Sequence, residues 1–190
     1  ILMLTESASG HPGGSLSAID VVAYLFLNEM NYDPANPMKE DRDRFILSKG
    51  HAAPALYAVL AHVGYFSRKL LKTLRKLGSP LQGHPDSRKL PGVESSTGSL
   101  GQGLSIAGGI ALAGKLDKRD YNVYCMVGDG EIQEGQIWEA SMAIPQYKLD
   151  NVCLIVDNNG LQIDGLVEDV MSVYPIADKF KAFNWNTIEI

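Results

Sequence analysis

Three short apolar runs along the chain are predicted to form buried strands, because each has strand length and is rich in Val, Ile or Leu. They cover residues 45–47, 121–127 and 152–156. A polar or glycine-containing segment follows each run, so each strand is expected to end in a loop that carries functional side chains. In an open parallel sheet these loops meet beyond the carboxyl ends of the strands, where ligands bind.

Apolar residues recur at helical spacing in most of the segments around these strands. A loop over residues 5–15 is expected to lead into a helix over 16–30, with Ser15 or Ser17 as its N-cap. A second helix is expected over 54–64, since Pro suits its first turn and Gly its end. Later elements are expected to be helices over 100–116, 134–143 and 174–183 and a strand over 187–190.

Residues 67–77 combine leucines with five basic side chains and are expected to form a helix with a basic face. That face could bind phosphate or a membrane surface, but a solvated surface is the simpler interpretation. Residues 78–97 hold many turn formers, which predicts a segment that wraps over the surface. The five glycines in 100–116 disfavour an isolated helix, so close packing against another helix or subunit must stabilise it.

Two of the predicted strands end in side chains that carry oxygen atoms. Asp129 stands between two glycines after the second strand, and the third strand is followed by Asp157, Asn158 and Asn159. Carboxylate and amide oxygens, without Cys or His, favour Mg²⁺ or Ca²⁺ over zinc. Because Mg²⁺ keeps positions open for phosphate oxygens, a phosphorylated cofactor is predicted as well. Either segment alone is also an ordinary turn, and only the pair favours a site.

Five motifs resemble those of transketolase and follow one another in the same order. They are residues 9–15 (SGHPGGS), 47–52 (LSKGHA), 83–86 (GHPD), 97–103 (TGSLGQG) and 128–135 (GDGEIQEG). The GDG sequence, with Asn159 thirty positions after Asp129, resembles the thiamine diphosphate motif. The resemblance extends from about residue 5 to residue 190. It implies an α/β chain with the thiamine diphosphate-binding fold, in which helices cover both faces of a mostly parallel central sheet.

The resemblance also implies roles for individual residues. Catalytic roles would fall to three of the four histidines and to one glutamate, namely His11, His51, His84 and Glu134. Thiamine diphosphate would be bound by His51, Gly98, Leu100, Gly130 and Ile163. Mg²⁺, for which Ca²⁺ can substitute, would be held by Asp129, Asn159 and the backbone carbonyl of Leu161. In transketolases the glutamate in the position of Glu134 belongs to a carboxylate network across the subunit interface.

The implied activity is transfer of a two-carbon glycolaldehyde unit from a ketose phosphate to an aldose phosphate, as in the pentose phosphate pathway. The cofactor would supply the reactive carbanion, and the histidines would bind hydroxyl groups and move protons. In transketolases a separate pyrimidine-binding domain activates the cofactor and binds the sugar phosphate. Residues 1–190 are therefore expected to be the diphosphate-side domain alone, incomplete at its C-terminal end and at its N-terminus.

A partner subunit is expected to carry the missing pyrimidine-binding domain. Ser99 stands where many single-chain transketolases have Pro, which resembles the split transketolases made of two polypeptides. The chain is thus expected to be inactive alone and to work as a dimer of chains or a heterotetramer. Three alternatives stay open: a deoxyxylulose-phosphate-synthase-like enzyme, a split transketolase for an unusual sugar, and a non-catalytic cofactor-binding subunit.

Composition limits the classes of protein to which the chain can belong. With 45% hydrophobic and 21% charged residues, the 190 residues can bury the core of one domain. A net charge of -5 argues against a nucleic-acid partner. No apolar run approaches the roughly 20 residues of a membrane span, and residues 1–4 are far too short for a signal peptide, so neither is expected. Cys125 and Cys153 are predicted to be buried free thiols, and a cytoplasmic location is expected.

Overall fold

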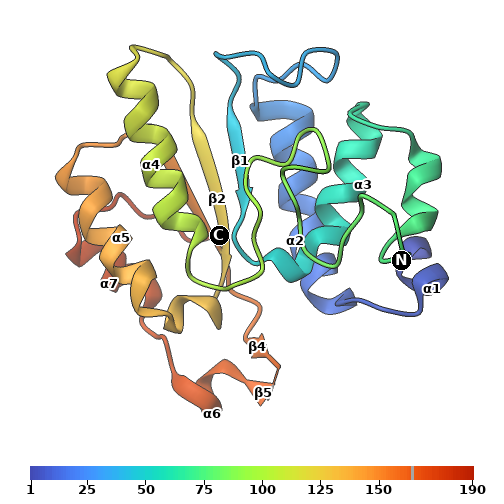
Figure 1. Ribbon diagram of the computed structural model, residues 1–190. Coiled ribbons are helices and arrows are strands. Elements are labelled where there is room, and N and C mark those ends of the chain that lie inside the picture. Colours follow the sequence, from blue (N-terminus) through green and yellow to red (C-terminus); the bar gives the residue numbers. More distant parts are fainter. Residues whose placement is uncertain (164) are drawn as a thin grey trace.

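A three-stranded parallel sheet forms the centre of the computed structural model, which describes residues 1–163 and 165–190 (Figure 1). β1 (Arg44–Leu47) and β3 (Val152–Asp157) both pair in parallel with β2 (Val123–Gly128), which lies between them. The three predicted strands are therefore confirmed. Because the strands run in one direction, their carboxyl ends lie at one edge of the sheet.

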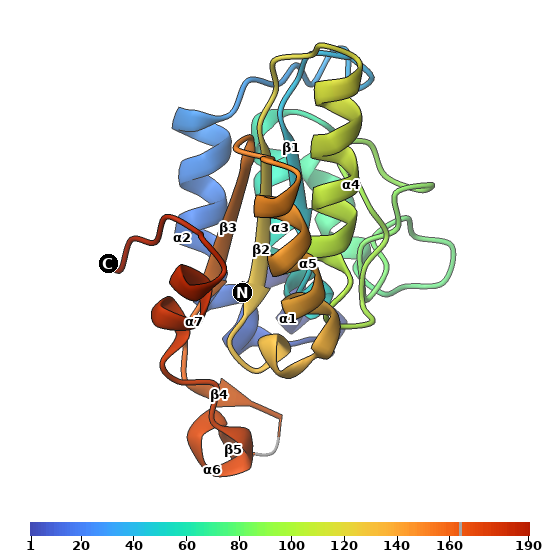
Figure 2. The same cartoon turned by 90° about the vertical axis from the view of Figure 1, so that its left-hand side faces the viewer.

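Helices cover both faces of this sheet, as the α/β prediction requires. One face carries α2 (Pro12–Tyr24), its π-helical continuation η1 (Leu25–Glu29) and α3 (Ala53–Val63). The other carries α4 (Gly103–Leu116) and α5 (Gly135–Gln146). Figure 2 shows α2 and α4 on opposite sides of the strands.

Side chains along β1 and β2 alternate between two hydrophobic cores. The core beneath α2 and α3 includes Phe45, Leu47, Tyr124 and Met126. The core beneath α4 and α5 includes Ile46, Val123, Cys125 and Val127. Since both faces are buried, these strands are continuous apolar runs in the sequence rather than alternating ones.

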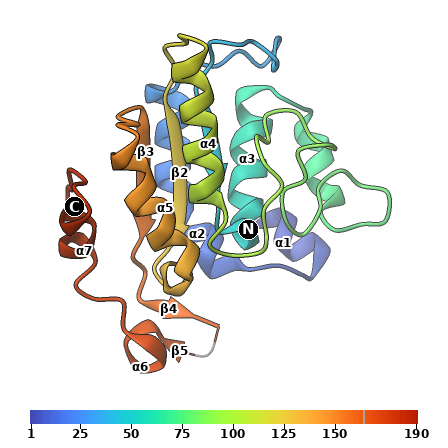
Figure 3. The same cartoon turned by 60° about the vertical axis from the view of Figure 1, so that its left-hand side comes forward.

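Shorter elements complete the chain. They are α1 (Leu2–Ser7), η2 (Gly50–Ala52), η3 (Arg68–Thr73), η4 (Glu131–Gln133), β4 (Leu161–Gln162), β5 (Gly165–Leu166), α6 (Val167–Met171) and α7 (Ile176–Ala182). The antiparallel β4–β5 hairpin and α6 project from the body below the carboxyl edge of the sheet (Figure 3). No helix among the described residues is long and apolar enough to cross a membrane.

The glycines of α4 allow close packing, which explains how a glycine-rich segment is helical. A Cβ atom added to Gly108 would lie 3.1 Å from Cγ1 of Ile144 on α5. One added to Gly114 would lie 2.7 Å from Cζ of Tyr121, ahead of β2. Contacts of this kind offset the low helix propensity of glycine.

The first long helix begins earlier than predicted. α1 occupies part of the segment 5–15, for which the sequence predicts a loop throughout. α2 begins at Pro12 with His11 in the N-cap position, so neither Ser15 nor Ser17 is the N-cap. The fixed φ angle of proline suits the first helical turn, and this local preference decides where the helix begins.

The predicted helix over 67–77 is mostly wrong. Only the short 3₁₀ segment η3 forms, and the chain then turns at Arg75, whose φ angle is +59°. The backbone N–H of Arg75 donates to the carbonyl of Leu81 at 2.9 Å, which folds the chain back on itself. Residues 78–97 contain no helix or strand among the described residues and wrap over the surface as predicted (Figure 3).

Two further predictions about the C-terminal half need correction. β3 is only partly buried, whereas β1, the other outer strand of the described sheet, is mostly buried. Cys153 is accordingly exposed, whereas Cys125 on the central strand is a buried thiol as predicted. The expected strand over 187–190 is not formed in the described chain, although α7 confirms the helix predicted over 174–183.

Candidate functional site

The loops after β2 and β3 meet at the carboxyl edge of the sheet. Asp129 is 1% exposed, and its Oδ2 accepts a hydrogen bond of 2.6 Å from the backbone N–H of Gly160. The N–H of Asp129 donates to the carbonyl of Asp157 at 3.1 Å. Asn159 directly precedes Gly160, and its Oδ1 accepts from the N–H of Leu161 at 2.9 Å. The three residues predicted to hold a metal are therefore brought into two adjoining loops.

The donor atoms of these loops fit a hard cation. Asp129 offers a carboxylate, Asn159 an amide oxygen and Leu161 a backbone carbonyl, which are the ligand types that Mg²⁺ and Ca²⁺ take. Oδ1 of Asp129 accepts from the N–H of Gly130 at 2.8 Å, and a carboxylate oxygen has a further lone pair for a cation. Within the described residues there is no group of three or more His, Cys, Asp or Glu side chains arranged to hold a metal.

The three predicted catalytic histidines lie together although they come from separate segments. His11 is the N-cap residue of α2 and His51 lies in η2, and the centroids of their rings are 5.4 Å apart. His84 lies in the segment 78–97, against Gly98. A Cβ atom on Gly98 would lie 2.9 Å from Cγ of His84, so the glycine lets this loop approach the histidine.

Burial and neighbouring cations keep two of these histidines neutral. Burial, followed by the charges of Lys49, His11 and His84, lowers the pKa of His51 from 6.5 to about 4. Burial also lowers the pKa of His11, with smaller contributions from Arg75 and His84. A neutral imidazole has one N–H donor and one acceptor nitrogen. At pH 7 each of these two side chains can therefore donate a hydrogen bond to a hydroxyl group or accept one from it.

A buried ion pair joins the ends of β1 and β3. Nζ of Lys49, which is 1% exposed, lies 2.5 Å from Oδ2 of Asp157. The same oxygen accepts a hydrogen bond of 2.6 Å from Oγ of Ser17 on α2. Asp157 is thus neutralised by a lysine and oriented by a hydroxyl group, which distinguishes it from Asp129 in the neighbouring loop.

Glu131 connects three segments below the sheet edge. The residue is 3% exposed, and its carboxylate accepts hydrogen bonds from Oγ of Ser48 at 2.5 Å and from the backbone N–H groups of Gly101 at 2.9 Å and Gly128 at 3.1 Å. Burial raises the pKa of Glu131, and the three hydrogen bonds oppose that shift. The end of β1, the loop before α4 and the end of β2 are therefore held by one side chain.

The loop over residues 98–103 also contacts the beginning of α5. Glu134 is exposed and occupies the N-cap position of this helix. A Cβ atom on Gly101 would lie 2.5 Å from Cβ of Glu134, and the φ angle of Gly101 is +84°. Leu100 lies between these contacts and is half-buried. Gly98 and Leu100 thus belong to one loop, which contacts His84 at Gly98 and Glu134 at Gly101.

The β4–β5 hairpin carries the remaining predicted residue. Gly130 approaches this hairpin, because a Cβ atom there would lie 3.0 Å from Cβ of Gln162. Ile163 follows in the turn, and its side chain is 96% exposed.

Sequence reasoning missed the structural parts played by Lys49 and Glu131. Both stand inside the transketolase-like motifs, but neither receives a function from its spacing. The signal that could have found them is a charged residue two or three positions after an apolar strand, since such a residue is buried only when it is paired or hydrogen-bonded. Asp157, at the end of the third strand, is the partner that this argument would have selected for Lys49.

An open parallel sheet with glycine-containing polar loops at its carboxyl edge defines an α/β protein of the class that binds phosphorylated ligands there. Within that class, the chain belongs to the transketolase family. The family model described as "Transketolase, thiamine diphosphate binding domain" matches residues 2–190.

Relatives from several organisms share this domain. The chain is 46% identical over 185 residues to one subunit of an apulose-4-phosphate transketolase of Phocaeicola vulgatus, and these cover 97% of this chain and 66% of that protein. It is 47% identical over 181 residues to one subunit of a 6-deoxy-6-sulfo-D-fructose transketolase from a Clostridium species, covering 95% and 66%. The human transketolase is 45% identical over 187 residues, which are 97% of this chain and 30% of the relative.

Solved structures agree with the fold. The transketolase of Leishmania mexicana superposes with a TM-score of 0.93 at 33% identity, over 99% of this chain and 30% of that one. The enzyme of Campylobacter jejuni gives a TM-score of 0.89 at 37% identity, over 95% and 29%. The chain thus spans about two thirds of the subunit-sized relatives and under a third of the full-length enzymes.

Proposed function

We propose that this chain forms the diphosphate-binding part of a thiamine diphosphate-dependent transketolase and works with a partner that carries the pyrimidine-binding part. The observation that carries the proposal is the bond that joins the loops of Asp129 and Asn159, together with the meeting of the His11 and His51 rings. Two relatives that are named as subunits support a two-polypeptide assembly. A dimer of such pairs is the assembly we expect.

Mg²⁺ would be held by Asp129, Asn159 and the carbonyl of Leu161. The donor types of these residues suit it, and Ca²⁺ can replace it because both cations prefer oxygen ligands. Thiamine diphosphate would contact His51, Gly98, Leu100, Gly130 and Ile163. When bound, the cofactor supplies a carbanion that the protein itself cannot provide.

His11, His51 and His84 would bind the hydroxyl and carbonyl oxygens of the sugar and move protons. Their closeness and the lowered pKa values of His11 and His51 support this role, since a neutral imidazole both donates and accepts. Glu134, exposed beside Gly101, would join the carboxylate network across the subunit interface. The reaction would move a glycolaldehyde unit from a ketose phosphate to an aldose phosphate.

The particular sugar is a separate question. The relatives described above are named for apulose-4-phosphate and for 6-deoxy-6-sulfo-D-fructose, while others are named simply transketolase. A split transketolase for an unusual sugar is therefore the second candidate, favoured by these names over a place in the pentose phosphate pathway.

Binding of the cofactor tests the site. Thiamine diphosphate is titrated into the assembled two-subunit complex with and without Mg²⁺, and binding is followed by calorimetry. We expect tight binding only with the metal, and a loss of at least tenfold in affinity for Asp129→Asn, since a charged ligand is replaced by a neutral one. The matched control is Asp120→Asn, an exposed carboxylate outside the strand, which should bind normally. Metal-independent binding would contradict the proposal and favour a non-catalytic role.

A substrate panel tests the reaction. The complex is incubated with ketose phosphates and aldose acceptors, and products are measured by mass spectrometry, with this chain alone as the comparison. Glycolaldehyde transfer by the complex but not by the separate chain is expected. Pyruvate-dependent condensation would instead indicate a deoxyxylulose-phosphate-synthase-like enzyme.

A further inference from the structure

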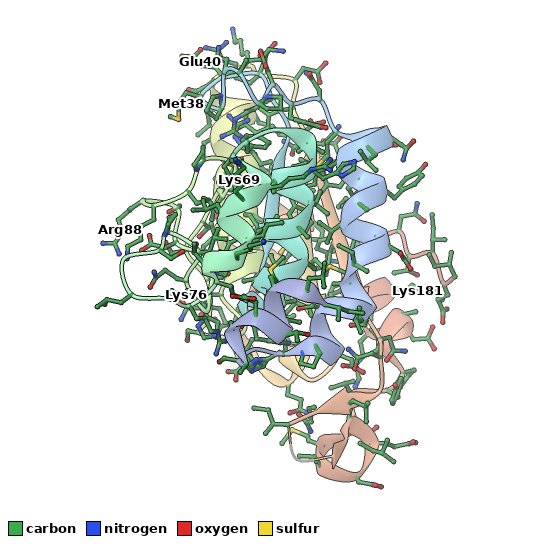
Figure 4. The ribbon with its side chains drawn as sticks, turned by 90° about the vertical axis from the view of Figure 1, so that its right-hand side faces the viewer. Met38, Glu40, Lys69, Lys76, Arg88 and Lys181 are labelled. Carbon is green, nitrogen blue, oxygen red and sulfur yellow. The ribbon has the colours of Figure 1, made fainter. Side chains whose placement is uncertain are left out.

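The segment 78–97, which carries His84, has no helix or strand among its described residues to hold it in place. Its outermost part projects from the body of the molecule, where the side chain of Arg88 is 85% exposed at the outer edge (Figure 4). His84 is itself exposed, so burial of its own side chain contributes little to fixing its position. Contacts of the backbone around His84 must do so.

A tyrosine hydroxyl group on α3 supplies two of these contacts. Tyr57 is 0% exposed, and its hydroxyl group donates to the carbonyl oxygens of Gln82 at 3.0 Å and of His84 at 3.2 Å. The hydroxyl group has one proton, which is shared between these two acceptors on either side of Gly83. Burial raises the pKa of Tyr57 and the charge of Asp86 adds to that shift, so the donor keeps its proton at neutral pH.

The same helix begins directly after another of the three histidines. η2, which contains His51, ends at Ala52, and α3 begins at Ala53. Tyr57 lies in the second turn of α3. This helix therefore carries His51 at its beginning and holds the backbone of His84 through one hydroxyl group.

A second contact holds the other side of the His84 loop, which we define as residues 82–85. Oγ1 of Thr97 donates to the carbonyl of Leu47, at the end of β1, at 2.7 Å. The backbone N–H of Thr97 donates to the carbonyl of Pro85 at 3.3 Å. The loop is thus bonded to α3 on one side and, through Thr97, to β1 on the other. Tyr57 differs from Thr97 because it contacts the carbonyl of the histidine itself.

We propose that Tyr57 is a positioning residue, which acts on the sugar substrate through His84 by fixing the backbone on both sides of Gly83. The inference rests on the proposed role of His84 in binding oxygen atoms of the sugar. Without the hydroxyl group, the carbonyls of Gln82 and His84 lose this donor and are free to turn toward water, and the imidazole moves with them. Tyr57→Phe removes the anchor without leaving a cavity, since the phenyl ring fills the same space in the core.

A double-mutant cycle tests whether Tyr57 acts through His84. The kcat/KM of the assembled complex is measured for Tyr57→Phe, for His84→Gln and for both together, with the ketose phosphate that the complex accepts best. We expect Tyr57→Phe alone to lower kcat/KM by roughly 10-fold, because a misplaced group in the site costs rate, and by less than about twofold when His84 is already replaced. Losses that multiply in the double variant would overturn the proposal, since they would show that the two residues act independently.

Tyr121→Phe is the matched control. Tyr121 is 8% exposed and donates to the carbonyl of Ile110 at 3.0 Å, in the core on the opposite face of the sheet from Tyr57. This variant loses the same kind of hydrogen bond, yet its kcat/KM should stay within about twofold of the unchanged complex. Both variants should keep their affinity for thiamine diphosphate. An equal loss of kcat/KM in Tyr121→Phe, or a loss of cofactor affinity in Tyr57→Phe, would indicate general damage to the fold and refute the positioning role.

The NMR signals of the histidine rings keep this inference separate from the proposed function. Histidines of this chain are isotope-labelled at Cε1 in the assembled complex, and the signal of His84 is identified by its absence in His84→Gln. Tyr57→Phe should shift or broaden the signal of His84 and leave that of the exposed His62 unchanged. This result in a complex that transfers no glycolaldehyde would support the anchor while refuting the transketolase proposal. An unchanged His84 signal would overturn the anchor whatever the activity.

Discussion

Replacement of Glu131 by Ala should strongly destabilise the fold. The carboxylate is 3% exposed and accepts hydrogen bonds from Ser48, Gly101 and Gly128, which belong to three segments far apart in the sequence. The hydroxyl group of Ser48 can rotate toward another acceptor. The two buried backbone N–H groups cannot, because the loop and strand that carry them are fixed by their own contacts.

The size of the effect follows from those two donors. Each buried N–H left without a partner costs roughly 1–3 kcal/mol. Removing the buried carboxylate offsets part of this cost, because its burial is unfavourable, as the raised pKa of Glu131 indicates. We expect a net decrease of about 2–4 kcal/mol in the free energy of unfolding. Glu131→Gln, which keeps the shape and one acceptor oxygen, should lose about 1–2 kcal/mol.

Urea unfolding monitored by circular dichroism at pH 7 measures these differences. Glu29→Ala is the matched control, because Glu29 is exposed at the end of η1 and should change stability by less than about 0.5 kcal/mol. The reasoning would be refuted if Glu131→Ala lost no more stability than Glu29→Ala. A larger loss for Gln than for Ala would show that the unsatisfied donors are not the dominant cost.

Three further predictions concern the same edge of the sheet. The pKa of His51 is lowered from 6.5 to about 4 in the folded state. Between pH 6.5 and 4 the imidazole is therefore protonated in the unfolded chain but not in the folded one, and the free energy of unfolding should decrease as the pH falls through this window. After allowance for partial exposure the loss is about 1–2 kcal/mol, and it should disappear in His51→Gln when urea midpoints are compared across this range. Lys49→Met leaves the carboxylate of Asp157 buried without its partner and should cost about 3–5 kcal/mol, whereas adding Asp157→Asn should restore part of the loss in a double-mutant cycle followed by thermal unfolding. Gly98→Ala places a Cβ 2.9 Å from Cγ of His84 at a φ angle of +144°, so it should displace this loop; a crystal structure that shows both residues unmoved would contradict this expectation.

Local patterns in the sequence were sufficient for the strands and for the loops that follow them. An apolar run of strand length indicates a strand of a sheet that is covered on both faces, and a parallel sheet brings the ends of such strands to one edge. Asp129 and Asn159 could therefore be placed near each other from the sequence alone, and the structure joins their loops through the bond to Gly160. The two loops of His11 and His51 were likewise found from motifs, and their rings lie 5.4 Å apart.

Local propensity failed where tertiary contacts decide the conformation. Residues 67–77 have the composition of a helix, yet the hydrogen bond from Arg75 to Leu81 ends the helical segment at once. Cys153 lies in an apolar run but is exposed, because burial of an outer strand depends on what covers it and not on its own sequence.

The sequence by itself determined the class of fold, the strand ends and the family-like motifs, since these depend on periodicity and on residue types at short spacing. Only the tertiary structure decided which partner each charged side chain has. Lys49 meets Asp157 across 108 positions, Glu131 meets Ser48 across 83, and Arg75 meets Ser9 across 66. Partners so distant in sequence leave no periodic pattern, because their meeting depends on how strands and loops are arranged in space.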